Sequence, residues 1–293
     1  MLNSTTLVPA TSANLGPGYD CLGVALQIYN RVTVTKENAP PPDSMNAEAA
    51  RAFFERAKIP PFSFSWKIEG EVPRSRGLGS SVTVRLGILC GLCELCANPL
   101  TRDHLFELCA ALEGHPDNAA PAAYGGFTIC GPENSVARFE VSSQLKFVLL
   151  IPDFEIATAD ARKVLPEKIS HRAATENTAN ACRITAAFAS RNYEQLRGAF
   201  TDHLHQDYRE PLIPFLKDVI RAGEKAGALG GYLSGSGSTI ACVTLEKPNE
   251  VGEAMRAAAG SSGKIIITTA DNTGATIGNR QSPIGNSPHA QVA

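Results

Sequence analysis

The stretch Pro73-Arg-Ser-Arg-Gly-Leu-Gly-Ser-Ser81 lies between two apolar segments of different periodicity. Before it, Phe62–Glu69 alternates apolar and polar side chains, which predicts a half-buried strand. After it, Val82–Ala97 is apolar nearly all round, which predicts a buried helix. A strand, a Gly/Ser loop and a long apolar helix therefore follow one another directly.

The loop from Gly77 to Ser81 has the composition of a phosphate-binding site. The first amides of a helix lack intrahelical acceptors and carry partial positive charge, and glycines let the backbone wrap closely around a phosphate. The plain alternative is a Gly-Ser linker with a helix N-cap. The loop is not a Walker A loop, because no GxxxxGK[ST] string occurs, and Val82 stands where a Rossmann fingerprint needs a third glycine or alanine.

The rest of the chain predicts a mixture of strands and helices in two domains. A composition shift near Pro152 divides it into residues 1–150 and 151–280, followed by a polar tail, 281–293, that we expect to be flexible. We expect strands at Thr5–Val8, Arg31–Thr35, Lys146–Pro152 and Thr239–Thr244, helices at Ala47–Lys58, Thr101–Glu113 and Glu176–Ala189 with two more before Gly227, and loops at Asn14–Asp20, Gly114–Gly126 and Gly227–Gly237.

The composition excludes several classes of partner. Among 293 residues, 27 are basic and 29 acidic, which argues against a nucleic-acid or anionic-membrane surface, since these need a basic excess. No stretch approaches the roughly 20 apolar residues of a membrane span, and the N-terminus lacks the pattern of a signal peptide. We therefore expect a cytoplasmic protein whose eight cysteines are free thiols.

The run Cys90-Gly-Leu-Cys93-Glu-Leu-Cys96 resembles a metal-binding pattern but lies inside the predicted apolar helix. Residues three apart share one face of a helix, where cysteine behaves as a small hydrophobic residue. No fourth Cys or His follows at cluster spacing, and the six histidines are not paired with Cys or Asp at zinc spacing. The run is therefore predicted to belong to the core.

Three motifs in order resemble those of the GHMP kinase family. They are Pro9-Ala-Thr-Ser-Ala-Asn-Leu-Gly-Pro-Gly-Tyr-Asp20, the phosphate loop with its Pro-x-x-x-Gly-Leu-Gly-Ser-Ser pattern, and Leu233-Ser-Gly-Ser-Gly-Ser-Thr239. With the segments between them, the likeness covers most of residues 5–245. It implies an α+β fold of two domains, an N-terminal ribosomal protein S5 domain 2-like domain and a C-terminal ferredoxin-like domain, with ATP and substrate bound between them.

Several segments resemble the branch of this family that phosphorylates L-homoserine. They are the first motif, Glu113-Gly-His-Pro-Asp-Asn118, Thr158-Ala-Asp-Ala-Arg162 and Tyr208-Arg-Glu-Pro-Leu-Ile-Pro214. Two positions depart from the family pattern. Tyr19 replaces a phenylalanine, and Ser238 replaces a proline, which makes the third motif less rigid but removes no ligand.

The roles of these residues follow from the resemblance and from homoserine itself, a zwitterion with a short side-chain alcohol. Its ammonium needs carboxylates, and its carboxylate needs guanidinium groups. A single arginine is usually only a surface charge, so the set matters more than any member. The resemblance implies a substrate-binding set of Asn14, Asp20, His115, Asp117, Thr158, Arg162 and Arg209, and a catalytic set of Asn14, Asp20, Asn118 and Arg162.

Phosphoryl transfer asks an enzyme mainly for positioning and charge stabilisation. By resemblance, Ser81 and Glu113 are the ligands of Mg²⁺, and the loop amides neutralise charge on the transferred group. The implied ATP-binding residues are Asn46, Pro73, Arg74, Ser75, Arg76, Gly77, Leu78, Gly79, Ser80, Ser81, Gly235, Ser236 and Gly237.

Some alternatives remain open at this point. Some members of the family take the hydroxyl proton with an aspartate, where this chain has Asn118, so proton removal needs no dedicated residue or falls to a neighbour such as Asp20. The chain could act on another small alcohol, or be a non-catalytic sensor on the same scaffold, although the Ser81–Glu113 pair argues against a sensor. Family members are often dimers, so a homodimer is a further expectation.

Overall fold

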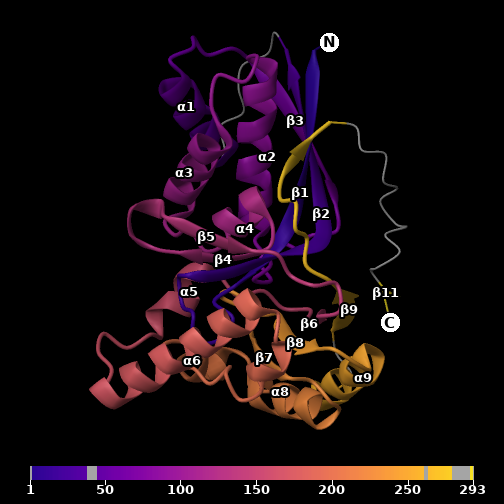
Figure 1. Cartoon of the computed structure of the whole chain (residues 1–293). Coiled ribbons are helices and arrows are strands. Elements are labelled where there is room, and N and C mark those ends of the chain that lie inside the picture. Colours follow the sequence, from indigo (N-terminus) through magenta and orange to yellow (C-terminus); the bar gives the residue numbers. More distant parts are fainter. Residues whose placement is uncertain (1, 38–44, 261–262, 279–290, 293) are drawn as a thin grey trace.

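Two antiparallel β-sheets form the frame of the computed structural model, which describes residues 2–37, 45–260, 263–278 and 291–292 (Figure 1). The first sheet has the order β10-β1-β2-β4-β5, and β3 pairs with the far end of β2. Its strands are β1 (Asn3–Ala13), β2 (Leu22–Lys36), β3 (Phe64–Gly70), β4 (Phe127–Cys130), β5 (Val136–Phe139) and β10 (Thr276–Ile277).

One face of the first sheet is covered by helices. They are α1 (Met45–Ala57), α2 (Ser80–Leu95), α3 (Arg102–Glu113) and α4 (Ala119–Tyr124), with a 3₁₀ turn at Pro132–Asn134. The central helix, α2, is buried along most of its length and packs on β1 and β2. Gly87 and Gly91 allow this close approach, because a Cβ on either would lie 2.6 Å from a side-chain carbon of Val32 or Val34.

The second sheet has the order β11-β9-β6-β8-β7, and helices α8 and α9 cover its outer face. Its strands are β6 (Lys146–Ile151), β7 (Gly230–Leu233), β8 (Ile240–Thr244), β9 (Lys264–Thr268) and β11 (Gln291–Val292). The helices of this half are α5 (Thr158–Lys163), α6 (His171–Ser190), α7 (Gln206–Arg209), α8 (Leu216–Lys225) and α9 (Pro248–Ala258), with 3₁₀ turns at Tyr193–Leu196 and Glu210–Leu212.

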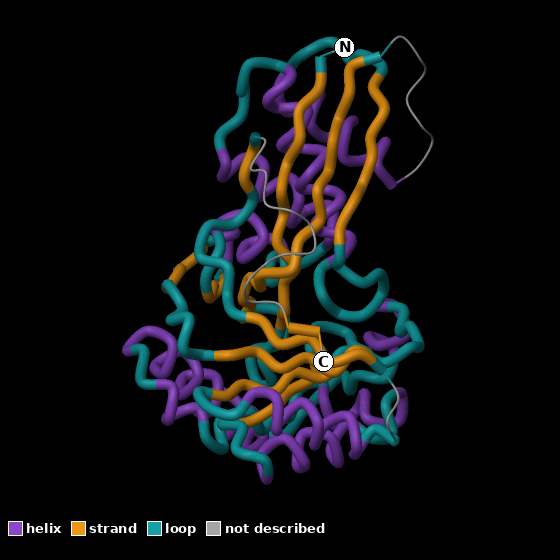
Figure 2. The backbone as a smooth tube through the Cα atoms, turned by 90° about the vertical axis from the view of Figure 1, so that its right-hand side faces the viewer, coloured by secondary structure: helices purple, strands orange, loops and turns teal. Residues whose placement is uncertain are grey.

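Each half of the molecule has an apolar cluster of its own, and a further apolar cluster joins the two halves. It combines side chains of β1, β2 and β4 with side chains of β6, β7 and α6. Phe127 of β4 stacks on Phe188 of α6 with ring centroids 4.2 Å apart. Figure 2 shows the long strands of the first sheet running toward the second sheet, whose strands lie across them. The loops at this junction build the site.

The structure confirms the predicted sequence of strand, loop and buried helix around Gly77–Ser81. It also confirms the core position of the cysteine run: Cys90 and Cys93 are buried, and Cys96 is half-buried against the same apolar cluster. All eight cysteines are free thiols, and burial raises the pKa of Cys90 to about 12. Among the described residues, no helix is both long and apolar enough to cross a membrane.

Two predicted loops were wrong in part. Residues 114–126 contain α4, a short helix of mostly alanines that packs on β1 and β2. Residues 227–237 contain β7, where glycines are needed because Phe200 and Cys242 lie against the strand. Of the tail 281–293, all but residues 291 and 292 lie outside the described residues, and the division after residue 150 stays a prediction.

Candidate active site

The phosphate loop owes its shape to two glycines. Gly77 and Gly79 have φ values of +72° and +66°, which residues other than glycine rarely adopt. A Cβ on Gly77 would lie 2.1 Å from the carbonyl oxygen of Ser234, and one on Gly79 would lie 2.1 Å from Thr11 Oγ1. Gly79 provides the N-cap of α2 without a side-chain hydrogen bond, and the first turn of α2 has no acidic residue, so its N–H groups are suited to an anion.

The third motif closes over the phosphate loop from the other half of the molecule. Ser234 Oγ donates to the Gly77 carbonyl oxygen at 2.6 Å, and the Gly235 N–H donates to the carbonyl oxygen of Ala13 at 3.1 Å. Asn14 Nδ2 in turn donates to the Gly235 carbonyl oxygen at 3.0 Å. These bonds bring together the three motifs, which are far apart in the sequence.

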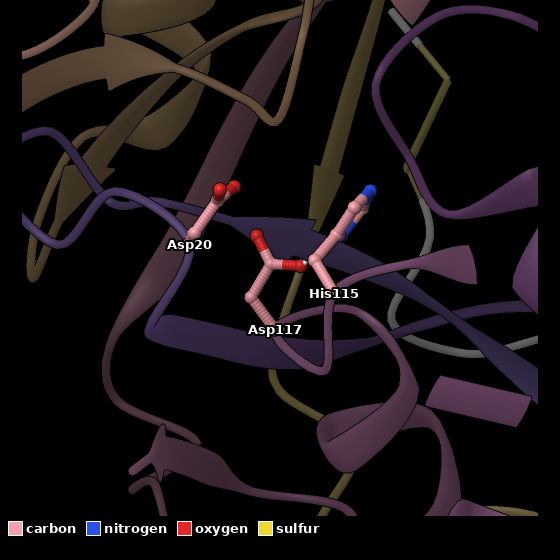
Figure 3. Close-up of side chains that lie close together, drawn as sticks. All are labelled: Asp20, His115 and Asp117. Atoms are coloured by element: carbon pink, nitrogen blue, oxygen red, sulfur yellow. Dashed lines mark hydrogen bonds and ion pairs between the residues drawn. The ribbon is translucent and has the colours of Figure 1, made fainter. Parts of the chain in front are cut away.

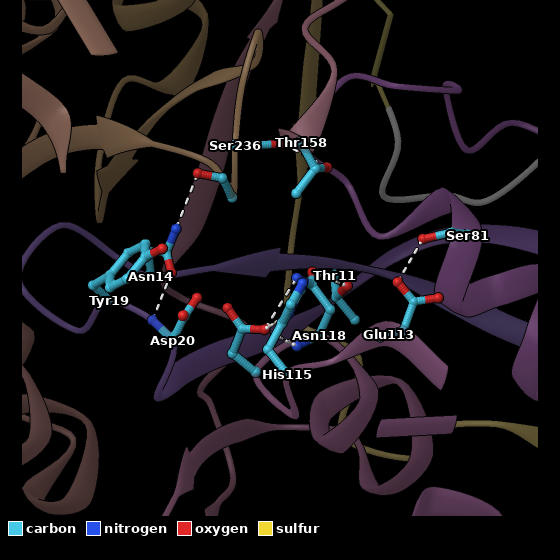
Figure 4. Close-up of polar contacts among 12 residues, drawn as sticks. Thr11, Asn14, Tyr19, Asp20, Ser81, Glu113, His115, Asn118, Thr158 and Ser236 are labelled. Carbon is cyan, nitrogen blue, oxygen red and sulfur yellow. Dashed lines mark hydrogen bonds and ion pairs between the residues drawn. The ribbon is translucent and has the colours of Figure 1, made fainter. Parts of the chain in front are cut away.

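A cavity of about 540 Å³ opens where the motifs meet (Figure 4). Among the predicted site residues, Pro73, Leu78 and Gly237 do not line it; Leu78 is fully buried instead. Asn46 lies in α1, but its side chain lies outside the described part of the chain. The lining consists of Asn14, Asp20, Trp66, Ile68, Arg74, Ser75, Arg76, Gly77, Gly79, Ser80, Ser81, Val82, Val84, Glu113, His115, Asp117, Asn118, Ile156, Ala157, Thr158, Arg162, Arg209, Gly235 and Ser236.

One end of the cavity gathers two carboxylates and a histidine (Figure 3). One ligand atom from each of Asp20, His115 and Asp117 lies within 4.8 Å of the other two. Asp117 is 2% exposed, and its Oδ1 lies 2.7 Å from His115 Nδ1. This hydrogen bond raises the pKa of His115, against the opposing effect of burial. Asn14 Oδ1 accepts from the Asp20 N–H at 3.0 Å and holds that turn in place.

Two guanidinium groups face these carboxylates. Arg162 of α5 forms an ion pair with Asp20, with Nη2 3.0 Å from Oδ1. Arg209 of α7 is 2% exposed, and its Nε and Nη1 donate to the carbonyl oxygens of Ala161 and Gly235, each at 3.0 Å. Its Nη2 makes no hydrogen bond to a described residue, so it can serve an anionic ligand.

Tyr19 lies against both of these arginines. Its hydroxyl accepts a hydrogen bond of 2.9 Å from Arg162 Nη1. The centre of its ring is 5.7 Å from the guanidinium carbon of Arg162 and 5.4 Å from that of Arg209, within the range of cation–π attraction. Burial raises the pKa of Tyr19, so it stays a neutral phenol. The sequence identified Tyr19 only as a departure from a pattern.

His205 contacts Arg209 but does not itself line the cavity. Arg209 Nη1 lies 3.2 Å from Nδ1 of His205, and the carbonyl oxygen of Gly16 lies 2.9 Å from its Nε2. Since an arginine can only donate, Nδ1 must accept and Nε2–H must donate to Gly16. Burial lowers the pKa of His205, in agreement with this neutral form.

The predicted metal ligands face each other beside the phosphate loop. Ser81 Oγ donates to Glu113 Oε2 at 2.8 Å, and the Glu113 side chain is 9% exposed (Figure 4). A hydroxyl and a carboxylate are hard oxygen donors of the kind that Mg²⁺ prefers, so this pair fits the ion. The other carboxylate oxygen, Oε1, is 2.6 Å from Arg85 Nη1, a contact that the sequence analysis did not anticipate.

Asn118 and Thr158 both line the cavity. Asn118 Oδ1 accepts from Thr11 Oγ1 at 2.7 Å, which turns its amide nitrogen toward Asp117. An amide has no basic atom to take a proton from an alcohol. Thr158 Oγ1 lies 3.4 Å from Ser236 Oγ and so connects α5 with the third motif.

Arg76 links the phosphate loop to residues 152–155. Its guanidinium donates to the carbonyl oxygens of Pro152 and Asp153 at 2.9 and 2.8 Å and forms an ion pair with Glu155 at 3.2 Å. These contacts tie the phosphate loop to the segment after β6. A role of Arg76 toward ATP itself stays a prediction.

Apolar side chains line the part of the cavity beside the phosphate loop. Trp66 and Ile68 come from β3, and Val82 and Val84 come from α2. The alternating pattern of residues 62–69 indicated a half-buried strand, but it could not show that Trp66 faces a ligand site. That placement depends on the pairing of β3 with β2, on which α2 packs.

The site and the fold agree with those of known kinases. Residues 45–126 match the model of the GHMP kinases N terminal domain, and residues 184–261 match that of the GHMP kinases C terminal. Together with the phosphate loop, these matches define an ATP-dependent small-molecule kinase.

Curated relatives narrow this class. The homoserine kinase of Halothermothrix orenii is 37% identical to this chain over 92% of it and 94% of the relative, and that of Clostridium beijerinckii is 38% identical over 93% and 98%. The chain belongs to the homoserine kinases of the GHMP kinase family.

Solved structures confirm the two-domain α+β fold predicted from the motifs. A homoserine kinase from Cytophaga hutchinsonii superposes with a TM-score of 0.86 at 24% identity, covering 94% of this chain and 97% of the other. A mevalonate kinase of L. major in complex with R-mevalonate superposes with a TM-score of 0.71 at 16% identity, covering 92% and 96%. At these identities the likeness concerns the fold alone.

Proposed function

We propose that this protein transfers the γ-phosphoryl group of ATP to the side-chain hydroxyl of L-homoserine, giving O-phospho-L-homoserine for threonine biosynthesis. The observation that carries the proposal is the arrangement of charge in the cavity. The carboxylates of Asp20 and Asp117 and the guanidinium groups of Arg162 and Arg209 line one cavity, in which Arg162 pairs with Asp20, and the phosphate loop lines it as well. A small amino acid carries the complementary charges, an ammonium for the carboxylates and a carboxylate for the guanidinium groups.

The substrate-binding roles follow from charge. The ammonium of homoserine binds to Asp20 and Asp117, with Asn14 and His115 beside them. Its carboxylate binds to Arg162 and to the unpaired Nη2 of Arg209, since guanidinium groups match carboxylates in shape and charge. This places the side-chain hydroxyl toward Asn118 and the phosphate loop.

The nucleotide occupies the other part of the cavity. The N–H groups at the start of α2 bind the phosphates, and Ser236 of the third motif completes their surroundings. Trp66 and Ile68 provide an apolar wall for the base. Ser81 and Glu113 would hold Mg²⁺, which would offset the charge of the polyphosphate and favour transfer of the γ-phosphoryl group.

The reaction itself forms a bond from the homoserine oxygen to the γ-phosphorus and breaks the bond to ADP, while the hydroxyl proton passes to an oxygen of the transferred phosphoryl group and then to water, without a dedicated base. The amides of the phosphate loop stabilise charge on the transferred group. Asn118 orients the alcohol but takes no proton, because its Oδ1 is engaged by Thr11 and its nitrogen is not basic.

A coupled assay of ADP release with MgATP tests this proposal. We expect turnover with L-homoserine across pH 7–9 and far less with serine, glycerol or mevalonate. No turnover with any alcohol would point to a sensor, and a preference for a different alcohol would point to another kinase. Arg162→Ala separates the last case further: it should impair homoserine binding severely, whereas turnover of an uncharged alcohol would survive.

We further propose that the protein works in the cytoplasm and forms a homodimer. The eight free thiols suit a reducing compartment. Light scattering on the purified chain tests the second point: a mass near 62 kDa, twice the 31.0 kDa of one chain, is expected for a dimer.

A further inference from the structure

Arg85 is a partly buried cation next to the predicted metal ligands. It lies one helical turn after Ser81 on α2, so both side chains leave the same face of the helix. Its Nη1 is 2.6 Å from Glu113 Oε1, while Glu113 Oε2 accepts from Ser81 at 2.8 Å. The Arg85 side chain is 13% exposed and does not line the cavity.

We propose that Arg85 is a positioning residue for Glu113. The two oxygens of this carboxylate have separate tasks. Arg85 holds Oε1, so only Oε2 faces Ser81 and the cavity. A carboxylate held in this way offers a metal ion a single, fixed oxygen next to the serine hydroxyl, instead of rotating between several arrangements.

Charge gives Arg85 a second effect on the same group. Glu113 lies beside a loop that binds a polyphosphate, and two anions at close range repel each other strongly in a partly buried site. The guanidinium of Arg85 offsets this repulsion from behind. Glu48 of α1 lies 3.9 Å from Nη2 and draws little on this charge, since its side chain is 58% exposed.

A purely structural role is the rival explanation, because the Arg85–Glu113 pair also joins α2 to α3. The two explanations differ in what a substitution changes. A structural bond affects the melting temperature alone, whereas a positioning residue changes the affinity for a divalent cation in protein that is still folded.

The test is Mn²⁺ binding by the full chain in the presence of a non-hydrolysable ATP analogue. Electron paramagnetic resonance measures the free and bound ion, and a nucleotide-only blank is subtracted. Arg85→Met removes the charge at similar volume, and Arg85→Lys keeps the charge but replaces the fork by a single point contact. The matched control is Arg56→Met, which breaks an exposed pair of 3.5 Å between α1 and Glu107 of α3, the helix that also carries Glu113.

We expect Mn²⁺ affinity to fall about tenfold in Arg85→Met and about threefold in Arg85→Lys, with Arg56→Met unchanged. Melting curves identify folded protein, and Arg85→Lys decides the matter if Arg85→Met does not fold. The inference is overturned if both variants at Arg85 bind Mn²⁺ within twofold of the control, or if the unsubstituted chain binds none.

This inference rests on the proposed function for the identity of the metal ligands and for nucleotide binding at the phosphate loop. The binding measurement needs no homoserine and no turnover. A chain that binds Mn²⁺ with the nucleotide through Arg85-dependent contacts, yet releases no ADP with homoserine, would disprove the proposed function and leave the inference standing.

Discussion

Arg162 binds Asp20 through both of its terminal nitrogens, with Nη2 3.0 Å from Oδ1 and Nη1 3.2 Å from Oδ2. The two residues are 142 positions apart and come from opposite halves of the molecule. In the proposed function they serve opposite ends of one substrate, the carboxylate and the ammonium. A zwitterion that binds between them replaces one ion pair within the protein by two with the substrate.

This exchange predicts which analogues the site rejects. Removing the ammonium gives 4-hydroxybutanoate, which leaves the carboxylates without a partner, and removing the carboxylate gives 3-aminopropan-1-ol, which leaves the arginines unpaired. A site with polar partners for a substrate group strongly discriminates against analogues that lack this group, because its own polar atoms are then left unpaired. We expect kcat/KM to fall at least about 100-fold for either compound relative to homoserine. Steady-state kinetics checks this, and turnover of one analogue within tenfold of homoserine would contradict the exchange.

Tyr19→Phe restores the residue that the family pattern has at this position and removes one hydrogen bond to Arg162. The ring, with its contacts to both arginines, is retained. A hydrogen bond contributes about 0.5–1.5 kcal/mol net, so KM for homoserine should rise about two- to tenfold, with KM for ATP unchanged. Tyr208→Phe is the control, because Tyr208 is 37% exposed. An unchanged KM for homoserine would show that the hydroxyl does not hold Arg162 in the substrate complex.

The parts of the site that could be predicted from sequence lie within short segments. The phosphate loop needs Gly77 and Gly79 next to a helix start, and this requirement is local. The contacts that were missed join distant segments. Arg85 has no recognisable pattern around it, and its importance comes from Glu113, which follows 28 residues later on another helix.

The missed elements of the fold have a similar cause. Helix α4 has only six residues and contains Pro121, so it lacks the length at which helical periodicity is visible. Strand β7 begins with Gly230 and Gly231, which normally indicate a turn. In the structure, Gly230 is needed because the ring of Phe200 leaves no room for a side chain: a Cβ on Gly230 would lie 2.3 Å from this ring.

His205 predicts how stability depends on pH. Burial lowers its pKa in the folded state below the ordinary value of 6.5, so the unfolded chain takes up this proton first as the pH falls. Its stabilising contribution is therefore complete above pH 6.5 and is lost as the pH falls below that value. The pH dependence from His115 runs in the opposite direction. The pKa of His115 is raised in the folded state, so its contribution to stability is lost as the pH rises through this raised value.

Urea unfolding between pH 5 and 8 measures this dependence. His205→Gln should lower the free energy of unfolding at pH 7.5 by about 1 kcal/mol, through the lost hydrogen bonding to Gly16 and Arg209. It should also flatten the decline on the acid side, since the titrating group is gone. An acid decline of the same steepness in this variant would assign it to other groups.

Gly77→Ala should damage both stability and nucleotide binding. The φ of +72° is costly for alanine, by about 1 kcal/mol or more, and its Cβ would also collide with the carbonyl oxygen of Ser234. Gly198 separates the two effects, because it has a similar φ of +67° and a Cβ there would meet nothing within 4 Å. Gly198→Ala should therefore cost about 1 kcal/mol with an unchanged KM for ATP. Gly77→Ala should cost more and raise KM for ATP at least about tenfold, because the third motif must move away from the phosphate loop. Equal losses of stability in the two variants, with equal KM for ATP, would mean that the loop tolerates the shift and that its contact with Ser234 does not position the nucleotide.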